Sequence, residues 1–213
     1  MPRLIETVRL RNGLAPLWHL HLRRLATSCQ ALGIPLPGEL LTPAGGHDRV
    51  HRLEVGVNGV ALSERPVGST LPVRLVVAGV PHRPYPHKTT DRAQFDDALA
   101  AAYREGADDA LLLSPGVGYV AEAANWGLFW WEGDRVCAPP LDLGILPGVA
   151  RARIVEVAGA VTERRVTLND LGGRSLFVAN AARGIVPVAS LAGQAVPSSP
   201  ATATLATRFW LLE

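Results

Sequence analysis

Apolar and polar residues alternate along the first part of the chain and then take up a helical period. The alternation over residues 4–11 (LIETVRLR) predicts a half-buried β-strand that ends at the Asn12-Gly13 turn. We expect residues 14–17 to form its return strand. Apolar residues then recur at helical spacing over residues 19–32, and Gly33 marks the end of that helix.

A second alternating stretch predicts a hairpin and is followed by a boundary. Residues 51–62 (HRLEVGVNGVAL) surround Asn58-Gly59, a dipeptide typical of a two-residue hairpin turn. The next residues, PVGSTLP, are rich in Pro, Gly and Ser and have no periodicity. We therefore expect a small α+β domain over residues 1–66, a linker over 67–72 and a larger domain over 73–213.

The larger domain is predicted to contain many short strands and a few helices. The expected strands lie at residues 73–80, 110–113, 119–122, 128–131, 135–138, 175–179 and 185–191. The expected helices lie at residues 92–105, 149–159 and 201–212, and Thr90 or Asp91 is expected to cap the first of them. This order predicts an α+β protein.

One residue stands out by its rarity. Lys88 is the only lysine among the 21 Lys and Arg residues of the chain. An amine can lose its proton and form an imine, whereas a guanidinium stays charged. Lys88 follows the irregular segment PHRPYPH and lies between a predicted strand and a predicted helix, where functional groups often lie. It is either a covalent anchor for a carbonyl compound or an ordinary surface residue, and its rarity alone does not decide.

Two further features fit the same kind of ligand. Glu122 ends the apolar strand GYVAE and is followed by two alanines, so it is a carboxylate in apolar surroundings. Gly148 to Ala150 begin a helix after Pro147, and the free N–H groups at a helix start can bind a phosphate. An aldehyde, a ring nitrogen and a phosphate occur together in pyridoxal 5′-phosphate. Each feature alone is commonplace, since a glutamate at a strand end is usually solvated.

Composition and missing motifs exclude several other classes. With 48% hydrophobic residues, 19% charged residues and a net charge of +2, the chain predicts a globular protein that binds neither nucleic acid nor a membrane. The chain lacks a long apolar run and a signal peptide, so we expect a cytoplasmic location. Cys29 and Cys137 form no metal-binding pattern, and we expect no metal. No nucleotide-binding or serine-hydrolase motif occurs.

Several segments together resemble one enzyme family. These segments are HLRRL at residues 21–25, HKTTDR, GADDALLLSPGVGYVAEA, PPLDLGILPGVAR and NAARGIVPV. The chain is similar over nearly its whole length to the class IV aminotransferase family, the fold-type IV pyridoxal-phosphate enzymes. It is most similar to the branch of 4-amino-4-deoxychorismate lyase, including the lyase-like domain of aminodeoxychorismate synthase fusions.

The resemblance implies a fold and a set of residue roles. The fold is D-amino-acid aminotransferase-like, with a small α/β domain and a larger pseudo-barrel domain, and the protein is expected to be a homodimer with pyridoxal 5′-phosphate between the domains. Lys88 is the Schiff-base and proton-transfer residue, and Glu122 pairs with the pyridinium nitrogen. The implied phosphate-side residues are Arg24, Val149, Ala150, Asn180 and Ala181. The implied substrate-side residues are Thr7, Arg9 and Arg183.

The resemblance also implies a reaction and leaves alternatives open. The expected reaction is the lysis of 4-amino-4-deoxychorismate to p-aminobenzoate and pyruvate for folate biosynthesis. The alternatives are an aminotransferase for D- or branched-chain amino acids and a weakly active or non-catalytic relative. The last alternative is based on three departures from the family pattern, Gly127, Ala150 and Ala181, two of which replace hydroxyl residues that often bind the phosphate. Each lost hydrogen bond to a charged group is worth roughly 1.5–3 kcal/mol, so we expect weaker cofactor retention.

Overall fold

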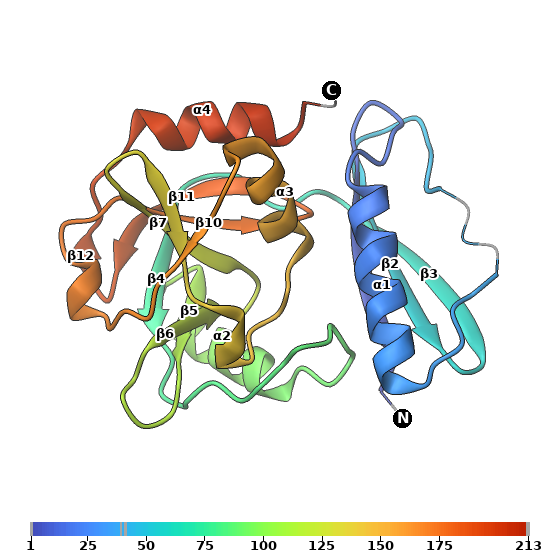
Figure 1. The fold of residues 1–213 in the computed structure, drawn as a ribbon, viewed down its shortest axis with the longest axis horizontal. Helices are drawn as coiled ribbons and strands as arrows, with labels where there is room; N and C mark the ends of the chain where they lie inside the picture. The colour runs from blue at the N-terminus through green and yellow to red at the C-terminus, as the bar shows by residue number, and fades with distance from the viewer. Residues whose placement is uncertain (1, 39, 41, 212–213) are drawn as a thin grey trace.

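The computed structural model describes residues 2–38, 40 and 42–211, which form two β-sheets with packed helices (Figure 1). The first sheet is antiparallel, in the order β1 (Leu4–Leu10), β2 (Arg49–Gly56) and β3 (Gly59–Arg65). Helix α1 (Trp18–Leu32) packs on one face of it, where apolar side chains of β1 and β2 meet those of the helix. Thr7, Arg52 and Arg65 extend from the other face toward the rest of the molecule, and α1 also contacts the helix over residues 149–158.

The predicted return strand over residues 14–17 is wrong. Arg11 and Leu14 form a single isolated bridge, and the chain then enters α1. β1 instead pairs along its whole length with β2, from Leu4 opposite Val55 to Leu10 opposite Arg49. Long-range pairing over seven residues thus replaces the local hairpin, and Pro16, which lacks an N–H, is unsuited to a paired strand.

The second sheet has nine strands and is mixed. Eight strands follow the order β6-β5-β4-β11-β10-β7-β8-β9, and β12 pairs with β11. Their bounds are β4 Val73–Val77, β5 Asp109–Leu113, β6 Val120–Ala123, β7 Gly127–Glu132, β8 Arg135–Ala138, β9 Thr162–Glu163, β10 Leu176–Asn180, β11 Gly184–Leu191 and β12 Gln194–Ala195. The sheet is curled into a half-barrel. β9 and β12 were not predicted, because two residues show no period.

Apolar side chains cover both faces of this second sheet. In β10, Leu176 and Val178 belong to one core cluster, whereas Phe177 and Ala179 belong to the other. Helices α3 (Val149–Ala158) and α4 (Pro200–Phe209) cover the second cluster, and α2 (Ala93–Arg104) packs on β5. Strands buried on both faces have continuous apolar sequences, which explains why these segments were recognised as strands.

The helix boundaries agree closely with the sequence pattern, but one cap differs. Neither Thr90 nor Asp91 caps α2, because its N-cap residue is Arg92 and no side chain accepts a hydrogen bond there. Ser199 caps α4 by accepting a hydrogen bond from the amide of Ala201. Two short 3-10 helices, Leu141–Leu143 and Asn169–Leu171, complete the fold.

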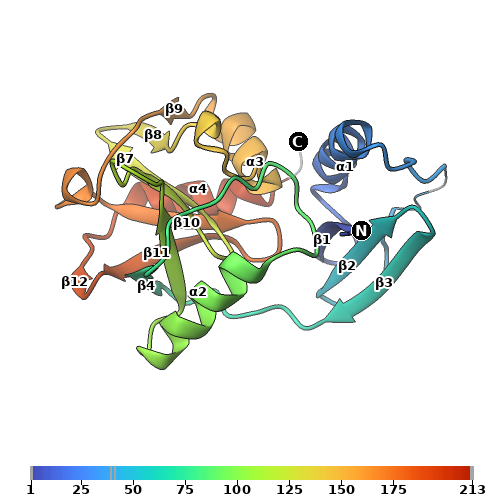
Figure 2. The same cartoon turned by 90° about the horizontal axis from the view of Figure 1, so that it is seen from below.

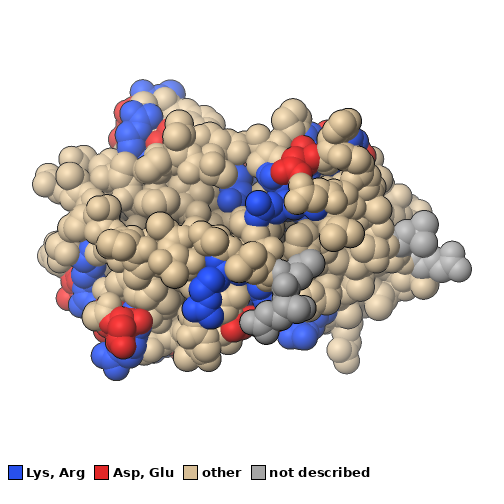
Figure 3. All heavy atoms as spheres, turned by 90° about the horizontal axis from the view of Figure 1, so that it is seen from above, with Lys and Arg blue, Asp and Glu red and all other residues tan. Residues whose placement is uncertain are grey.

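The chain crosses between the two sheets more than once. Residues 66–72 form neither helix nor strand and carry the chain from β3 to β4 (Figure 2). The division into two domains at this segment stays a prediction. Among the described residues, no helix is long and apolar enough to cross a membrane. On the face drawn in Figure 3, acidic and basic side chains lie together in small mixed groups.

Candidate active site

A cavity of about 190 Å³ lies between the two sheets. It receives side chains from both sheets, from α1 and from the start of α3. Of the residues predicted from the sequence, the structure places Thr7, Arg24, Lys88, Glu122, Val149, Ala150, Asn180, Ala181 and Arg183 at the cavity wall. Residues that are up to 176 positions apart in sequence, Thr7 and Arg183, therefore share one site.

The backbone around Lys88 is fixed to the first sheet. The Lys88 carbonyl accepts a hydrogen bond from the amide of Ile5 at 2.7 Å, and the amide of Thr90 donates to the carbonyl of Arg3 at 2.8 Å. Within its own loop, the Tyr85 hydroxyl lies 2.6 Å from both the amide and the carbonyl oxygen of Thr89. A proline-rich loop without regular structure thus holds Lys88 in a defined place.

The surroundings of Lys88 disfavour its charged form. Burial among protein atoms is the largest cause, followed by repulsion from Arg24 and Arg92. Glu6 and Glu122 oppose these effects but are weaker, so the pKa of Lys88 falls to about 7. This lower pKa increases the share of neutral amine near neutral pH, and the neutral amine is the form that attacks a carbonyl carbon.

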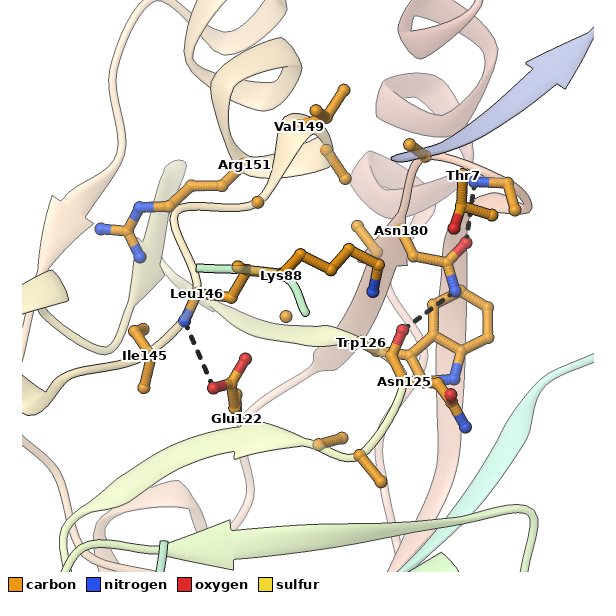
Figure 4. A pocket seen from close by; sticks show the side chains of 18 of the residues that line it. Thr7, Lys88, Glu122, Asn125, Trp126, Ile145, Leu146, Val149, Arg151 and Asn180 are labelled. Carbon is orange, nitrogen blue, oxygen red and sulfur yellow. Dashed lines mark hydrogen bonds between the residues drawn. The ribbon is translucent and has the colours of Figure 1, made fainter. Parts of the chain in front are cut away.

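Glu122 presents one bonded and one free oxygen. Its Oε1 accepts a hydrogen bond from the Leu146 amide at 3.2 Å and lies 2.9 Å from Nε2 of the buried His82. Its Oε2 has no hydrogen bond to any described residue. In Figure 4 the Glu122 carboxyl group and the start of α3 lie on opposite sides of the Lys88 side chain. A carboxylate oxygen that is available at the cavity wall can accept the N–H of a protonated ring.

The start of α3 offers backbone donors. No side chain caps this helix, and the first helical hydrogen bond within it runs from the Ala152 amide to the Gly148 carbonyl. The amides of Val149 and Ala150 precede that bond and therefore have no partner within the helix. Both residues line the cavity, so their N–H groups and the positive end of the helix dipole suit a phosphate.

Arg24 lines the cavity, and its guanidinium also forms an ion pair with Glu6. Its Nε donates to Glu6 Oε1 at 2.9 Å, its Nη2 donates to Glu6 Oε2, and His21 Nδ1 also lies against that oxygen. Burial alone would raise the pKa of Glu6, but Arg24 and His21 outweigh it and lower this pKa to about 2. Glu6 therefore fixes the direction of the Arg24 guanidinium and leaves Nη1 without a hydrogen bond to the described residues.

Asn180 organises the turn between β10 and β11. Its Oδ1 accepts hydrogen bonds from the amides of Ala182 and Arg183, at 3.1 and 2.8 Å, and its Nδ2 donates to the carbonyl of Asn125. The Asn180 side chain is thus used within the protein. Ala181 lies at the tip of this turn and brings only a methyl group and backbone to the cavity.

Of the three predicted substrate-side residues, Arg9 is not among the residues that line the cavity. Thr7 and Arg9 lie on the same face of β1, as the alternation predicts. Arg9, however, donates from Nη2 to Asp48 at 2.6 Å and from Nε to the Leu10 carbonyl at 3.0 Å. These bonds hold the Arg9 guanidinium away from the cavity, so the position of Arg9 gives no support to a substrate role.

Several cavity residues escaped the sequence analysis. Arg52, Arg65, Tyr85, Arg92 and Asn125 also line the site. Arginines are frequent in this chain, and nothing in the local sequence distinguishes these from the others. The alternation in residues 51–62 is the only signal available, because it places Arg52 on the sheet face opposite to the apolar residues.

The described residues fit pyridoxal phosphate. An amine of lowered pKa, an available carboxylate oxygen and an uncapped helix start surround one cavity, which matches the aldehyde, the ring nitrogen and the phosphate of this cofactor. No group of three or more His, Cys, Asp or Glu among residues 2–38, 40 and 42–211 is arranged to hold a metal ion. The residue roles themselves stay predictions.

Comparisons with known proteins identify the same group of enzymes. The family model described as amino-transferase class IV matches residues 62–191. A comparison with curated protein sequences finds no match. The structure is similar to a branched-chain aminotransferase from the archaeon Thermoproteus uzoniensis, with a TM-score of 0.85 and 22% identity, covering 97% of this chain and 84% of that one.

Two further solved structures share the fold. A candidate 4-amino-4-deoxychorismate lyase from Legionella pneumophila has a TM-score of 0.80 and 23% identity, covering 95% of this chain and 88% of that one. The pyridoxal-phosphate-bound form of a hypothetical aminotransferase from Mycobacterium tuberculosis has a TM-score of 0.82 and 21% identity, covering 97% and 87%. The predicted fold-type IV architecture is therefore confirmed, and so is the predicted cofactor.

Proposed function

Because the chain belongs to the class IV aminotransferase family, whose members use pyridoxal phosphate, we propose that it is a lyase that cleaves 4-amino-4-deoxychorismate to p-aminobenzoate and pyruvate. The observation that carries the proposal is the position of Lys88, an amine with a pKa of about 7 in the same cavity as Glu122 and the α3 start. Two findings favour the lyase, the likeness to the Legionella pneumophila structure and the surplus of arginines around the cavity. The proposed substrate carries two carboxylates, which these arginines suit.

The bound cofactor supplies a covalent link to the substrate amine and withdraws electrons from the carbon that bears it. Lys88 then takes the proton from that carbon, since its neutral form is a base near pH 7. The bond between the substrate ring and the enolpyruvyl oxygen breaks, and the substrate ring becomes aromatic. The departing enolpyruvate takes up one proton at its methylene carbon and becomes pyruvate, so the reaction needs no oxidant, reductant or added water.

The other residues of the site bind the cofactor and fix its orientation. Glu122 keeps a proton on the ring nitrogen through its available oxygen, and His82 and the Leu146 amide fix its position. The α3 amides and Arg24 bind the phosphate, while Glu6 directs Arg24. The packing of protein atoms around Lys88 favours its neutral amine.

The direct test is product formation by the cofactor-loaded enzyme. Incubation with 4-amino-4-deoxychorismate should release p-aminobenzoate, followed by its fluorescence, and an equal amount of pyruvate, followed by a coupled lactate dehydrogenase assay. Lys88→Ala should lower the rate by about 10²–10⁴-fold, the usual contribution of a positioned proton-transfer group. If neither product appears with the wild-type enzyme, the lyase proposal is wrong.

A second candidate is an aminotransferase for a D- or branched-chain amino acid. The likeness to the Thermoproteus uzoniensis enzyme favours it, because that structure has the higher TM-score. An amino acid added without a keto acid would convert the cofactor of a transaminase to its amine form. A lyase would keep its original absorbance while pyruvate accumulates, so one spectrum separates the two candidates.

A weakly active or non-catalytic relative is the third candidate. Gly127, Ala150 and Ala181, which depart from the family pattern, all line the cavity. A Cβ atom on Gly127 would lie 3.2 Å from the Phe129 ring, so Ala150 and Ala181 are the departures that bear on phosphate binding. A spectrum of the purified protein without a cofactor band, unchanged by added pyridoxal phosphate, would favour this candidate over both enzymes.

A further inference from the structure

The arginines around the cavity fall into two groups. Six arginines line it, and four of them lie within ion-pair distance of a carboxylate. The four pairs are Arg24 with Glu6, Arg52 with Glu54, Arg92 with Asp96 and Arg151 with Glu163. Within the described residues, Arg65 and Arg183 form no ion pair. These two cations are therefore the ones that the protein leaves available at the cavity.

Arg65 reaches the cavity from the first sheet. It is the last residue of β3 and lies two residues after Ser63, which pairs with Arg52, so it shares the cavity-facing side of the sheet with Arg52 and Thr7. The one hydrogen bond described for its guanidinium is a long contact of 3.4 Å from Nη1 to the Pro66 carbonyl. Its N–H groups are largely unused.

Arg183 reaches the cavity from the second sheet. It lies in the turn between β10 and β11, and its Cζ atom is 3.9 Å from the centre of the Trp126 ring. A Cβ atom on Gly68 would lie 3.2 Å from its Cδ atom, so the linker segment confines the side chain from the other side. The guanidinium is thus held in place by packing, while none of its N–H groups donates to a described residue.

The charges around Arg183 leave it short of anionic partners. Burial is the largest cause that lowers the pKa of Arg183, and repulsion from Arg65 adds to it. Asp109 and Asp108 act in the opposite direction, yet neither forms an ion pair with Arg183. Asp109 is itself buried and accepts hydrogen bonds from the amides of Ala110 and Ala124 and from Asn125. An anion between Arg65 and Arg183 would relieve their repulsion.

We propose that Arg65 and Arg183 together bind a second carboxylate of the substrate, so that the enzyme acts on dicarboxylates whose amine end reaches Lys88. A guanidinium offers two parallel N–H groups that match the two oxygens of a carboxylate, and Arg183 is already oriented by Trp126. This inference rests on the proposed function, because it names the part of the substrate that this end of the cavity selects. It also assigns a binding role to Arg65, which no local sequence signal indicates.

The test compares two probes on the cofactor-loaded enzyme by isothermal titration calorimetry. Benzene-1,3-dicarboxylate carries two carboxylates, and benzoate carries one on the same ring. We expect the dicarboxylate to bind at least about tenfold more tightly, as one added hydrogen bond between charged groups would give. Equal affinity of the wild-type enzyme for the two probes overturns the proposal, whatever the variants do.

Matched variants locate the effect. Arg65→Gln and Arg183→Gln should each reduce the preference for the dicarboxylate to less than about threefold, because the added carboxylate loses a charged partner. Arg52→Gln is the control, since Arg52 lines the same cavity but already has Glu54 as its partner, and its preference should persist. A preference that survives both Arg65→Gln and Arg183→Gln also overturns the proposal.

The same measurements separate this inference from the proposed reaction. A strong dicarboxylate preference without release of p-aminobenzoate and pyruvate would disprove the lyase and keep the carboxylate site. Release of both products by an enzyme with no dicarboxylate preference would disprove the site and keep the lyase.

Discussion

A lysine amine in water keeps its proton up to a pH of about 10, so an enzyme that needs the neutral amine at pH 7 must lower the pKa of that amine. Here the pKa of Lys88 is lowered by burial and by the positive charges of Arg24 and Arg92. Both arginines are themselves balanced by acids, Glu6 and Asp96, so their charge is tolerated. The reactivity of Lys88 is thus produced both by Arg92, which is four residues away, and by Arg24, which is far from it in sequence.

Labelling of the apoenzyme can measure this effect. Because Lys88 is the only lysine, a brief pulse of acetic anhydride at different pH values can modify just one side-chain amine. We expect its modification to rise with pH about a midpoint near pH 7, since the amine is charged below its pKa and neutral above it. Peptide mass spectrometry separates this signal from that of the N-terminal amine. A midpoint above pH 9 would contradict the assigned environment.

Single residues could be predicted from the sequence only where their rarity or position was unusual. Lys88 was recognisable by its count, and Glu122 by its place at the end of an apolar strand. Arg65 was not recognisable, because its role depends on the pairing of β3 with β2 and on a turn more than a hundred residues later. Arg9 shows the reverse case, since Asp48, distant in sequence, withdraws a side chain that the alternation had placed correctly.

At the scale of elements, one buried acid ties β1 to α1. Glu6 is 2% exposed and contacts both Arg24 and His21 on the helix. Its pKa of about 2 lies below the ordinary value of 4.5, so its ionised form stabilises the folded protein above pH 4.5. This contribution is lost as the pH falls from 4.5 toward 2.

Replacement of this acid should therefore be costly and should change the response to acid. We expect Glu6→Gln to lower the free energy of unfolding at pH 7 by about 3 kcal/mol, because Arg24 loses its buried partner. The variant should also lose the part of the stability decline that wild type shows between pH 4.5 and pH 3. Urea unfolding at pH 7, 4.5 and 3 measures both effects.

A matched variant on the same sheet serves as the control. Glu54 pairs with Arg52 but is more exposed, so Glu54→Gln should cost less than about 1 kcal/mol. Equal losses for Glu6→Gln and Glu54→Gln would show that burial does not strengthen the Glu6 contacts.

Elements with long periodic patterns were predictable, and short or non-local ones were not. The hairpin around Asn58-Gly59 and the four helices appear where the pattern places them, because each has several turns or pairs of alternation. The false return strand at residues 14–17 arose because the sequence cannot show that the residues of β1 have partners 39 to 51 positions away. Pairing across that distance is decided by the packing of α1 on the sheet.

At the scale of the molecule, residues of both sheets line the cavity, so a cofactor bound there should stabilise the two sheets together. Pyridoxal phosphate at 100 times its dissociation constant adds about 2.7 kcal/mol to the free energy of unfolding. For a chain of this size, that gain corresponds to a rise of roughly 5–10 °C in Tm. We expect one cooperative transition that shifts as a whole. Differential scanning calorimetry with and without cofactor measures the shift, and two transitions of which only one moves would contradict it.

The expected homodimer stays a prediction, which a light-scattering mass of about twice 22.7 kDa would support. The composition predicted a globular chain and the motifs predicted the family, but neither could show how the two sheets meet. That arrangement depends on backbone pairing, such as that between Leu4 and Thr89, and backbone pairing across this distance leaves no pattern in the sequence.

Because of the hydrogen bonds between Lys88 and β1, the two predicted cofactor contacts, Lys88 and Glu122, are attached to different sheets. Lys88 belongs by sequence to the larger part of the chain, yet its backbone is attached to the first sheet, whereas Glu122 lies within the second. Any rotation of one sheet against the other therefore changes the distance between the amine and the carboxylate. A cofactor bound to both side chains would therefore restrain the two sheets in one relative orientation. The distance between the Lys88 amine and the Glu122 carboxylate would change whenever that orientation changed.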